Sequence, residues 1–236
     1  MLPSSTSLGT AELLDGWPPP VLDPAGPYAS AITTLSWVLF VFAAIVILVV
    51  IAALALALFG NEKQKRRLGG TRIIWIAGIA FPLVALTALL VWGLTLTRQL
   101  SDPIRGNELR VRVTGEMWWW RVAYLDAERR PVIQDANEIH IPAGQPVVLE
   151  LESADVIHSL WVPRLSGKPA MNPGQRNLMR IQADAPGVYG GQCAEYCGGP
   201  HALMGLFVVA HDLGSFRQMM QARLARERSP SVTADR

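Results

Sequence analysis

Residues 32–60 read ITTLSWVLFVFAAIVILVVIAALALALFG, and this stretch decides the fold of the N-terminal part of the chain. No charged residue occurs anywhere between Asp23 and Glu62. About 20 consecutive apolar residues are enough to cross a bilayer as a helix. The sequence therefore predicts a first transmembrane helix at 31–60.

A second uncharged run, of 25 residues, extends from Ile73 to Thr97 and predicts a second transmembrane helix at 73–98. Neither run contains an ionisable residue, although such residues usually mark ion or proton pathways inside a membrane. Both runs are rich in alanine and glycine, which allow close helix contact in lipid. We therefore expect the two helices to anchor the chain and to pack against a larger membrane partner.

The charges around these helices predict how they are oriented. The first 30 residues contain no Lys or Arg, whereas residues 61–72 contain Lys63, Lys65, Arg66, Arg67 and Arg72. Short loops rich in Lys and Arg remain in the cytoplasm. We therefore expect 61–72 to be a basic cytoplasmic loop of a two-pass protein of the bacterial inner membrane. Residues 1–30 then form a periplasmic lead-in, and the chain beyond the second helix is also periplasmic.

The composition excludes several other classes of protein. Hydrophobic residues make up 50% of the 236-residue chain, charged residues make up 17%, and the mean hydropathy is +0.26. These values do not fit a disulfide-stapled secreted miniprotein, a disordered chain or a nucleic-acid-binding protein. No nucleic-acid partner is expected.

The segment 107–212 has the pattern of an all-β domain. Glu108–Gly115 alternates polar and apolar residues with period two, as a half-buried strand does, and Gly and Pro separate the segments that follow. The other predicted strands are Met117–Tyr124, Glu138–Ile141, Pro146–Glu152, Val156–Val162, Arg176–Ala183, Gly187–Gln192 and Gly205–Ala210. About eight short strands fit a β-sandwich or a Greek-key barrel. Residues 213–236 are expected to form a short basic helix, at Ser215–Arg228, and a frayed tail.

Both cysteines of the chain lie in one loop, Cys193-Ala-Glu-Tyr-Cys197-Gly-Gly-Pro-His201-Ala-Leu-Met204, and His158 lies near the end of an earlier predicted strand. A Cys193–Cys197 disulfide is one interpretation, but it leaves the histidines and the methionine without a role. A tetrahedral zinc site with two cysteines and two histidines leaves Met204 unused. A copper site uses all five side chains, and two thiolates can bridge two copper ions.

These motifs resemble subunit II of the haem-copper cytochrome c oxidases. The resemblance rests on Asp155-Val-Ile-His158-Ser159 and on Gly187-Val-Tyr-Gly-Gly-Gln-Cys193 with the loop that follows, and it extends from the hairpin to about Ala210. It implies an N-terminal two-helix transmembrane hairpin plus an all-β cupredoxin-like Greek-key sandwich. It also implies a binuclear copper centre, CuA, in the periplasmic head.

The resemblance further implies six metal-contacting residues, which are His158, Cys193, Glu195, Cys197, His201 and Met204. In that family the two cysteines bridge both copper ions, and each histidine supplies one nitrogen. The methionine is the weak ligand of one ion, and the backbone carbonyl of Glu195 is a ligand of the other. The Glu195 side chain is expected to bind a magnesium or manganese ion shared with subunit I.

Three consecutive tryptophans, Trp118 to Trp120, form a second cluster. On a strand, Trp118 and Trp120 would face one way and Trp119 the other, so at least one indole is expected in the core. The resemblance implies that Trp118 is the exposed residue at which electrons from cytochrome c enter. Residues 107–212 carry nine basic and twelve acidic residues, a net charge of −3 that suits a basic partner. Candidate steering acids are Asp126, Glu128, Asp135 and Asp155.

The implied function is that of the subunit that accepts electrons in a respiratory oxidase. CuA passes electrons to haem in subunit I, where oxygen is reduced to water, and subunit III is a further expected partner. A quinol oxidase subunit would lack the copper ligands, a copper-delivery protein would carry a Met-rich or His-rich tract, and a nitrous-oxide-reductase-like enzyme would need another large domain.

Three departures from the family pattern suggest an alternative bacterial type. Gly167-Lys168-Pro169 is followed by Ala170 rather than an acidic residue, and Ile74 rather than Glu precedes Trp75. The chain also has no haem-attachment motif Cys-x-x-Cys-His.

Overall fold

The computed structural model describes residues 19–100 and 108–228. These form two compact units, one within 34–102 and the other made of the chain up to Thr33 together with the chain from residue 103 on. The beginning of the predicted lead-in, 1–18, and the predicted tail, 229–236, lie outside the described residues. The two units are described separately.

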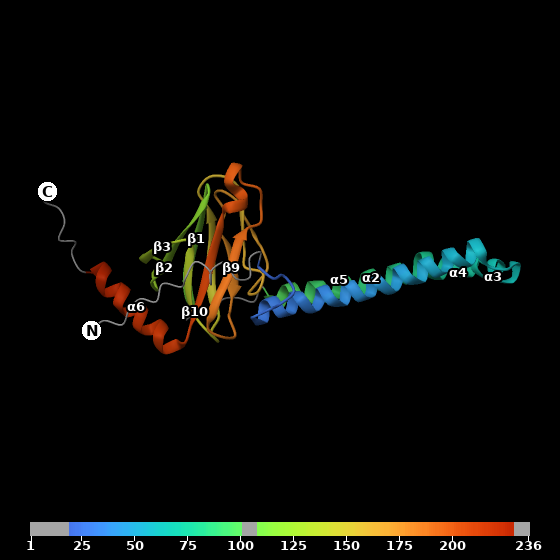
Figure 1. Ribbon diagram of the computed structural model, residues 1–236, viewed down its shortest axis with the longest axis horizontal. Helices are drawn as coiled ribbons and strands as arrows, with labels where there is room; N and C mark the ends of the chain where they lie inside the picture. The colour runs from blue at the N-terminus through green and yellow to red at the C-terminus, as the bar shows by residue number, and fades with distance from the viewer. Residues whose placement is uncertain (1–18, 101–107, 229–236) are drawn as a thin grey trace. The chain divides into compact units, whose positions relative to one another are not determined.

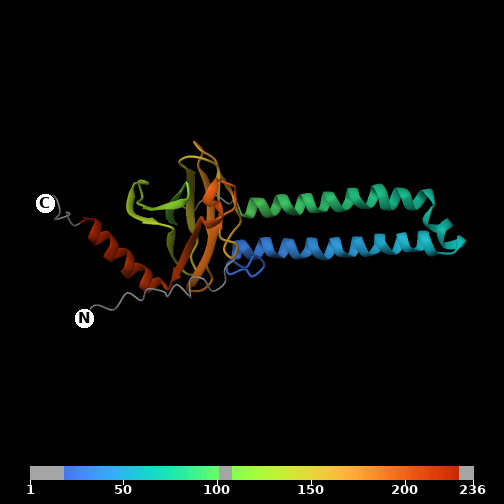
Figure 2. The same cartoon turned by 45° about the horizontal axis from the view of Figure 1, so that its top comes forward.

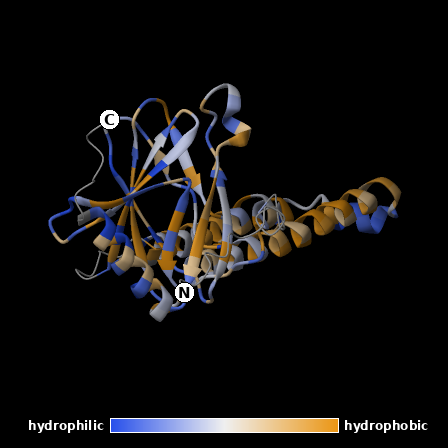
Figure 3. Ribbon diagram, turned by 60° about the vertical axis from the view of Figure 1, so that its left-hand side comes forward, coloured by the Kyte–Doolittle hydropathy of each residue, from blue (hydrophilic) through white to orange (hydrophobic). Residues whose placement is uncertain are grey.

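The membrane-anchor unit is an antiparallel pair of long helices (Figure 2). Its elements are α2 (Pro27–Phe59), α3 (Glu62–Leu68), α4 (Thr71–Trp75), the wide-turn helix η1 (Ile76–Ala80) and α5 (Phe81–Leu100). Phe42 of α2 stacks on Phe81 of α5 with ring centroids 6.1 Å apart. The helices Pro27–Phe59 and Thr71–Arg98 are long and apolar enough to cross a membrane, and Figure 3 shows their hydrophobic colouring.

The basic segment 61–72, which connects the two long helices, is helical over most of its length. Asn61 begins α3 by accepting a hydrogen bond from the backbone N–H of Gln64 at 3.0 Å. The Gln64 side chain accepts one from the Asn61 N–H at 2.8 Å, which completes a capping box. The basic residues Lys65, Arg66 and Arg67 lie in the last turn of α3, where the helix dipole favours positive charge.

The second long helix widens locally just before Pro82. The wide turns of η1, Ile76–Ala80, lie directly before Pro82. Proline has no N–H to donate to the carbonyl four residues earlier, and wide turns are one way in which a helix accommodates that loss. The helix then continues without interruption as α5.

The head is a sandwich of two five-stranded sheets (Figure 1). The first sheet has the order β3 (Pro131–Ala136), β2 (Trp119–Leu125), β1 (Leu109–Glu116), β5 (Val147–Ser153), β8 (Asn177–Ile181). The second has the order β4 (Glu138–Pro142), β10 (Gly205–His211), β9 (Gly187–Cys193), β6 (His158–Trp161), β7 (Ala170–Met171). β1 pairs with β5 in parallel, as β4 does with β10, whereas the other pairs are antiparallel.

This architecture confirms the predicted fold class of two long apolar helices and an all-β sandwich. All eight predicted strands are present with shifted ends. β3 and the two-residue β7 were not predicted from the sequence. Side chains from both sheets are fully buried between the layers. They include Val111, Val113, Val122, Leu149, Leu160 and Leu206.

The C-terminal helix α6 (Leu213–Arg228) packs against β3, β4 and β10. Phe216, Met220 and Leu224 recur every fourth residue and form its apolar stripe against the core. Arg223, on the same helix, forms an ion pair with Asp135 and donates to Nε2 of His140 at 3.0 Å. The helix is therefore part of the folded head.

Residues 23–26 form a second attachment to the head, here called the N-terminal strap. The backbone N–H of Ala25 donates to the carbonyl of Arg164 at 2.8 Å, and the N–H of Asp184 donates to the carbonyl of Ala25 at 2.9 Å. Asp23 also forms an ion pair with Arg164 at 2.7 Å. A Cβ atom on Gly26 would lie 1.9 Å from the carbonyl oxygen of Gln182, so only glycine fits there.

Candidate metal centre

One end of the sandwich collects the predicted metal ligands. The parallel pairing of β1 with β5 brings the ends of these strands together, and His158 is the first residue of β6. Cys193 is the last residue of β9, and residues 194–204 lead back to β10. Three connections therefore meet here, namely the β1–β2 turn, the β5–β6 loop and the segment 194–204.

The side-chain donor atoms converge at this end. The sulfurs of Cys193 and Cys197 lie 3.9 Å apart as free thiols, a separation that rules out a disulfide in this structure. Nδ1 of His158 lies 3.8 Å from the Cys193 sulfur, and Nδ1 of His201 lies 3.5 Å from the Cys197 sulfur. The thioether sulfur of Met204 lies 3.7 Å from the Cys197 sulfur.

Backbone contacts hold the ligand loop in place. The N–H of Cys193 donates to the carbonyl of Met204 at 2.9 Å, and the N–H of Met204 donates to the carbonyl of His201 at 3.2 Å. The Cys193 thiol approaches the carbonyl oxygen of Glu195 at 3.2 Å, which brings that oxygen to the cluster, as the resemblance implies. The side chain of Glu195 is exposed.

The cluster has the chemistry of a copper site. Two thiols, two imidazoles and a thioether are soft ligands, which favour copper over magnesium or calcium. A four-ligand zinc site would leave the buried Met204 sulfur, which faces Cys197, without a role. Burial and then the neighbouring Cys193 raise the pKa of the Cys197 thiol to about 11, so a bound metal must displace a proton from that thiol near neutral pH. The residues present therefore fit a copper centre.

Trp118 lies beside the cluster, but it is not part of a strand. Met117 and Trp118 form the turn between β1 and β2, so the expected alternation of the three tryptophans is wrong at this position. Trp120 is fully buried, whereas Trp118 is 39% exposed. The indole N–H of Trp118 donates to the carbonyl oxygen of Cys197 at 3.0 Å, which connects an exposed aromatic ring to a cluster cysteine.

The candidate steering acids already have partners. Asp126 forms an ion pair with Arg130 at 2.9 Å, and Asp135 forms one with Arg223. Asp155 accepts a hydrogen bond from Nε2 of His158 at 2.8 Å. Partial burial alone would raise the pKa of Asp155, but hydrogen bonds from His158 and from two backbone N–H groups outweigh it and lower the pKa. Asp155 is thus part of the site rather than a free surface charge.

Two glycines shape the site, and the sequence analysis missed both. A Cβ atom on Gly198, whose φ is +115°, would lie 3.1 Å from Nε1 of Trp118. A Cβ atom on Gly115 would lie 2.7 Å from Cδ2 of His158. A glycine inside a strand often marks a close approach of this kind, so the position of Gly115 in an alternating segment was the available signal.

We expect Gly115→Ala to disturb the cluster, because the imidazole of His158 must move away from the new methyl group. Overpacking of this kind costs about 1–3 kcal/mol. Thermal unfolding of the metal-free chain and its copper affinity would measure the effect. Gly187→Ala is the matched control, since a Cβ atom at that strand glycine meets nothing closer than 3.6 Å. Equal effects of the two substitutions would contradict the assignment.

Exposed apolar side chains surround the cluster. Within residues 108–228, all the large exposed hydrophobic side chains except Leu178 lie on the three connections at this end. This set, here called the apolar rim, comprises Met117, Trp118, Val156, Ile157, Tyr196 and Leu203. Contiguous exposed apolar residues mark sites of interaction with other proteins. The rim is therefore the candidate docking surface.

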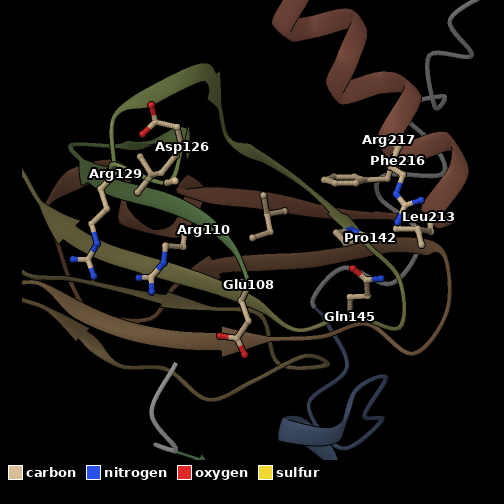
Figure 4. A pocket seen from close by; sticks show the side chains of 12 residues that line it. Glu108, Arg110, Asp126, Arg129, Pro142, Gln145, Leu213, Phe216 and Arg217 are labelled. Atoms are coloured by element: carbon tan, nitrogen blue, oxygen red, sulfur yellow. The ribbon is translucent and has the colours of Figure 1, made fainter. Parts of the chain in front are cut away.

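A hollow of about 560 Å³ lies elsewhere on the head, and none of the predicted metal ligands lines it (Figure 4). Several of its charged side chains are paired. Arg110 contacts Glu150 at 3.5 Å, Asp126 contacts Arg130, and Glu108 contacts Arg180 at 3.3 Å.

Comparison with known proteins shows which proteins this chain is similar to. A family model described as "Cytochrome C oxidase subunit II, periplasmic domain" matches residues 125–211. Cytochrome c oxidase subunit 2 of Alkalihalophilus pseudofirmus is 32% identical over 223 residues, which are 90% of this chain and 64% of that relative. The chain therefore spans about two thirds of that relative's length. The subunit 2 of Zea mays is 26% identical over 92% of this chain and 94% of its own.

Among solved structures, the periplasmic domain of subunit II of cytochrome oxidase from Bradyrhizobium japonicum is 25% identical. The match covers 50% of this chain and 94% of that domain, with a TM-score of 0.46. The sandwich and the sulfur–imidazole cluster define a cupredoxin-like protein with two long apolar helices. The sequence matches make the assignment specific: the chain belongs to the cytochrome c oxidase subunit II family.

Proposed function

We propose that this chain is the electron-accepting subunit of a respiratory haem-copper oxidase. The observation that carries the proposal is the convergence of two thiols, two imidazoles and a thioether beneath an apolar rim. In the complete enzyme, electrons from cytochrome c would pass through the head to haem in subunit I, where oxygen is reduced to water. Subunit III is a further proposed partner.

The residues have distinct proposed roles. Cys193 and Cys197 would bridge a binuclear copper centre, and His158 and His201 would each supply one nitrogen. Met204 and the Glu195 carbonyl would complete the set as weak ligands, and the exposed Glu195 side chain would bind a magnesium or manganese ion shared with subunit I. When bound, the copper pair supplies a centre that takes up and releases one electron at a time.

Trp118 is the proposed point at which electrons enter. Its ring is exposed, its N–H donates to the carbonyl of Cys197, and it belongs to the apolar rim. The apolar rim is the contact surface that this proposal assigns to the docking cytochrome.

The two long helices would hold the head at the periplasmic face of the bacterial inner membrane. The basic helix α3 would then lie on the cytoplasmic side, in accordance with the positive-inside rule. The charge-free runs within these helices are suited to packing against subunit I.

The full chain, purified in detergent and loaded with copper, tests this proposal. We expect two copper ions per chain and an electron paramagnetic resonance spectrum in which one unpaired electron is shared by both ions. One bound zinc ion, or a Cys193–Cys197 disulfide in freshly loaded protein, would contradict the proposal. Purification from native membranes should also recover a haem-bearing partner.

A further inference from the structure

The carboxylate of Asp155 lies between His158 and the Trp118 turn, and three N–H groups converge on it. Its Oδ1 accepts from Nε2 of His158 at 2.8 Å and from the backbone N–H of Val156 at 2.6 Å. Its Oδ2 accepts from the backbone N–H of Met117 at 2.8 Å. One side chain thereby joins the β5–β6 loop, the first residue of β6 and the β1–β2 turn.

The contact with His158 selects one tautomer of the imidazole. Nε2 must carry the hydrogen in order to donate to the carboxylate, so Nδ1 keeps its lone pair. Nδ1 is the nitrogen that faces the Cys193 sulfur at 3.8 Å. A carboxylate on the outer nitrogen also makes an imidazole a stronger electron donor to a metal. The pairing therefore prepares His158 to act as a ligand.

The contact with Met117 acts on the other side of the site. Met117 directly precedes Trp118, whose indole reaches the carbonyl of Cys197. A backbone hydrogen bond of 3.0 Å from the N–H of Ala154 to the carbonyl of Gly115 links the same loop to the end of β1. The position of the Trp118 turn thus depends on the loop that carries Asp155.

We propose that Asp155 is a positioning residue that orients His158 for metal binding and at the same time holds the turn that carries Trp118. This inference rests on the proposed function, because it takes His158 as a copper ligand and Trp118 as the residue at which electrons enter. It replaces the expectation that Asp155 serves mainly to steer a basic partner.

Asparagine cannot substitute for this carboxylate. An amide has one acceptor oxygen and one NH₂ group, whereas the donors at Asp155 occupy both oxygens. In one orientation the NH₂ group would face the N–H of Met117. In the other it would face His158 and Val156, and it would favour the tautomer whose Nδ1 carries the hydrogen. Either orientation also removes the negative charge beside the imidazole.

The test compares Asp155→Asn with wild type in the full chain, with Asp126→Asn as the matched control. Asp126 is also a partly exposed acid that accepts a backbone hydrogen bond, from Arg130 at 2.8 Å, and it lines the hollow of Figure 4. We expect Asp155→Asn to lower copper affinity by about 10–100-fold. We also expect the reduction potential to rise by about 59 mV. For one electron this shift changes the oxidised-to-reduced ratio at a fixed potential about tenfold.

Electron transfer from reduced cytochrome c should slow at low and at high ionic strength alike, because a displaced turn is insensitive to salt. A loss confined to low ionic strength, with potential and copper affinity unchanged, would show a steering role and overturn the proposal. Equal changes of copper affinity and reduction potential in Asp126→Asn would also overturn the proposal.

If Asp155→Asn does not fold, nuclear magnetic resonance of the metal-free wild type still tests the proposal. The Nε2 proton of His158 should exchange slowly with water, and a rapidly exchanging proton would refute the contact. This measurement also separates the two hypotheses. A wild-type chain that binds no copper would contradict the proposed function, whereas the exchange rate still decides whether Asp155 positions His158.

Discussion

Replacement of Cys197 by serine is expected to abolish copper binding. The Cys197 sulfur lies at the centre of the cluster, within 4 Å of Nδ1 of His201 and of the sulfurs of Met204 and Cys193. A hydroxyl group is a poor ligand for copper, which prefers thiolate. Because loss of a residue that only supports a ligand costs about 10–100-fold in affinity, loss of this ligand should cost at least as much.

Met204→Leu is the informative companion to Cys197→Ser. Leucine fills nearly the same buried volume, so packing is retained and only the weak thioether contact is lost. We expect this variant to keep its copper and to change mainly its reduction potential. Copper content after dialysis against a chelator measures both variants. Equal metal loss in the two would contradict the separate roles of thiolate and thioether.

Trp118→Ala is expected to separate electron transfer from metal binding. The indole contacts the site through the carbonyl of Cys197 and not through a metal-ligating side chain, so the copper spectrum should be unchanged. Removal of an exposed ring that links the docking surface to the cluster should slow electron transfer from cytochrome c by more than tenfold. That factor corresponds to a barrier increase of about 1.4 kcal/mol.

Stopped-flow oxidation of reduced cytochrome c measures this effect, with Tyr196→Ala as the competing variant. Tyr196 is another exposed aromatic residue of the apolar rim, and its ring meets that of His201 edge-on at 5.7 Å. A larger loss of electron-transfer rate in Tyr196→Ala would show that electrons enter at Tyr196 instead. Loss of copper or of folding in Trp118→Ala would show that the indole serves mainly in packing.

Much of the fold was predictable because it depends on local pattern. The two charge-free runs leave few alternatives to long apolar helices, and alternation together with the Gly and Pro residues between segments located eight of the strands. Alternation fails where partners distant in sequence decide burial. Glu150 falls on an outward-facing position of β5, yet its side chain is fully buried. Four guanidinium groups surround it at 3.3–3.9 Å, those of Arg110, Arg112, Arg129 and Arg176.

The candidate site shows the same division. Its donors were predictable from residue type and spacing, because most of them lie within one loop. The contacts that position them were not, because Gly115 meets His158, and Asp155 meets Met117, only through the parallel pairing of β1 with β5. The turn at Met117 and Trp118 was missed for a related reason, since nothing in a run of three tryptophans indicates a reversal of the chain.

The N-terminal strap bears on how a soluble version of the head would be engineered. A fragment cut just after the anchor, near residue 108, would lack residues 23–26 and therefore both backbone hydrogen bonds to Arg164 and Asp184. At about 0.5–1.5 kcal/mol each, their loss is a large fraction of the stability of a small domain. A truncated head could then be less stable for reasons unrelated to its metal. Grafting the strap back through a polar linker would restore the native boundary of the domain.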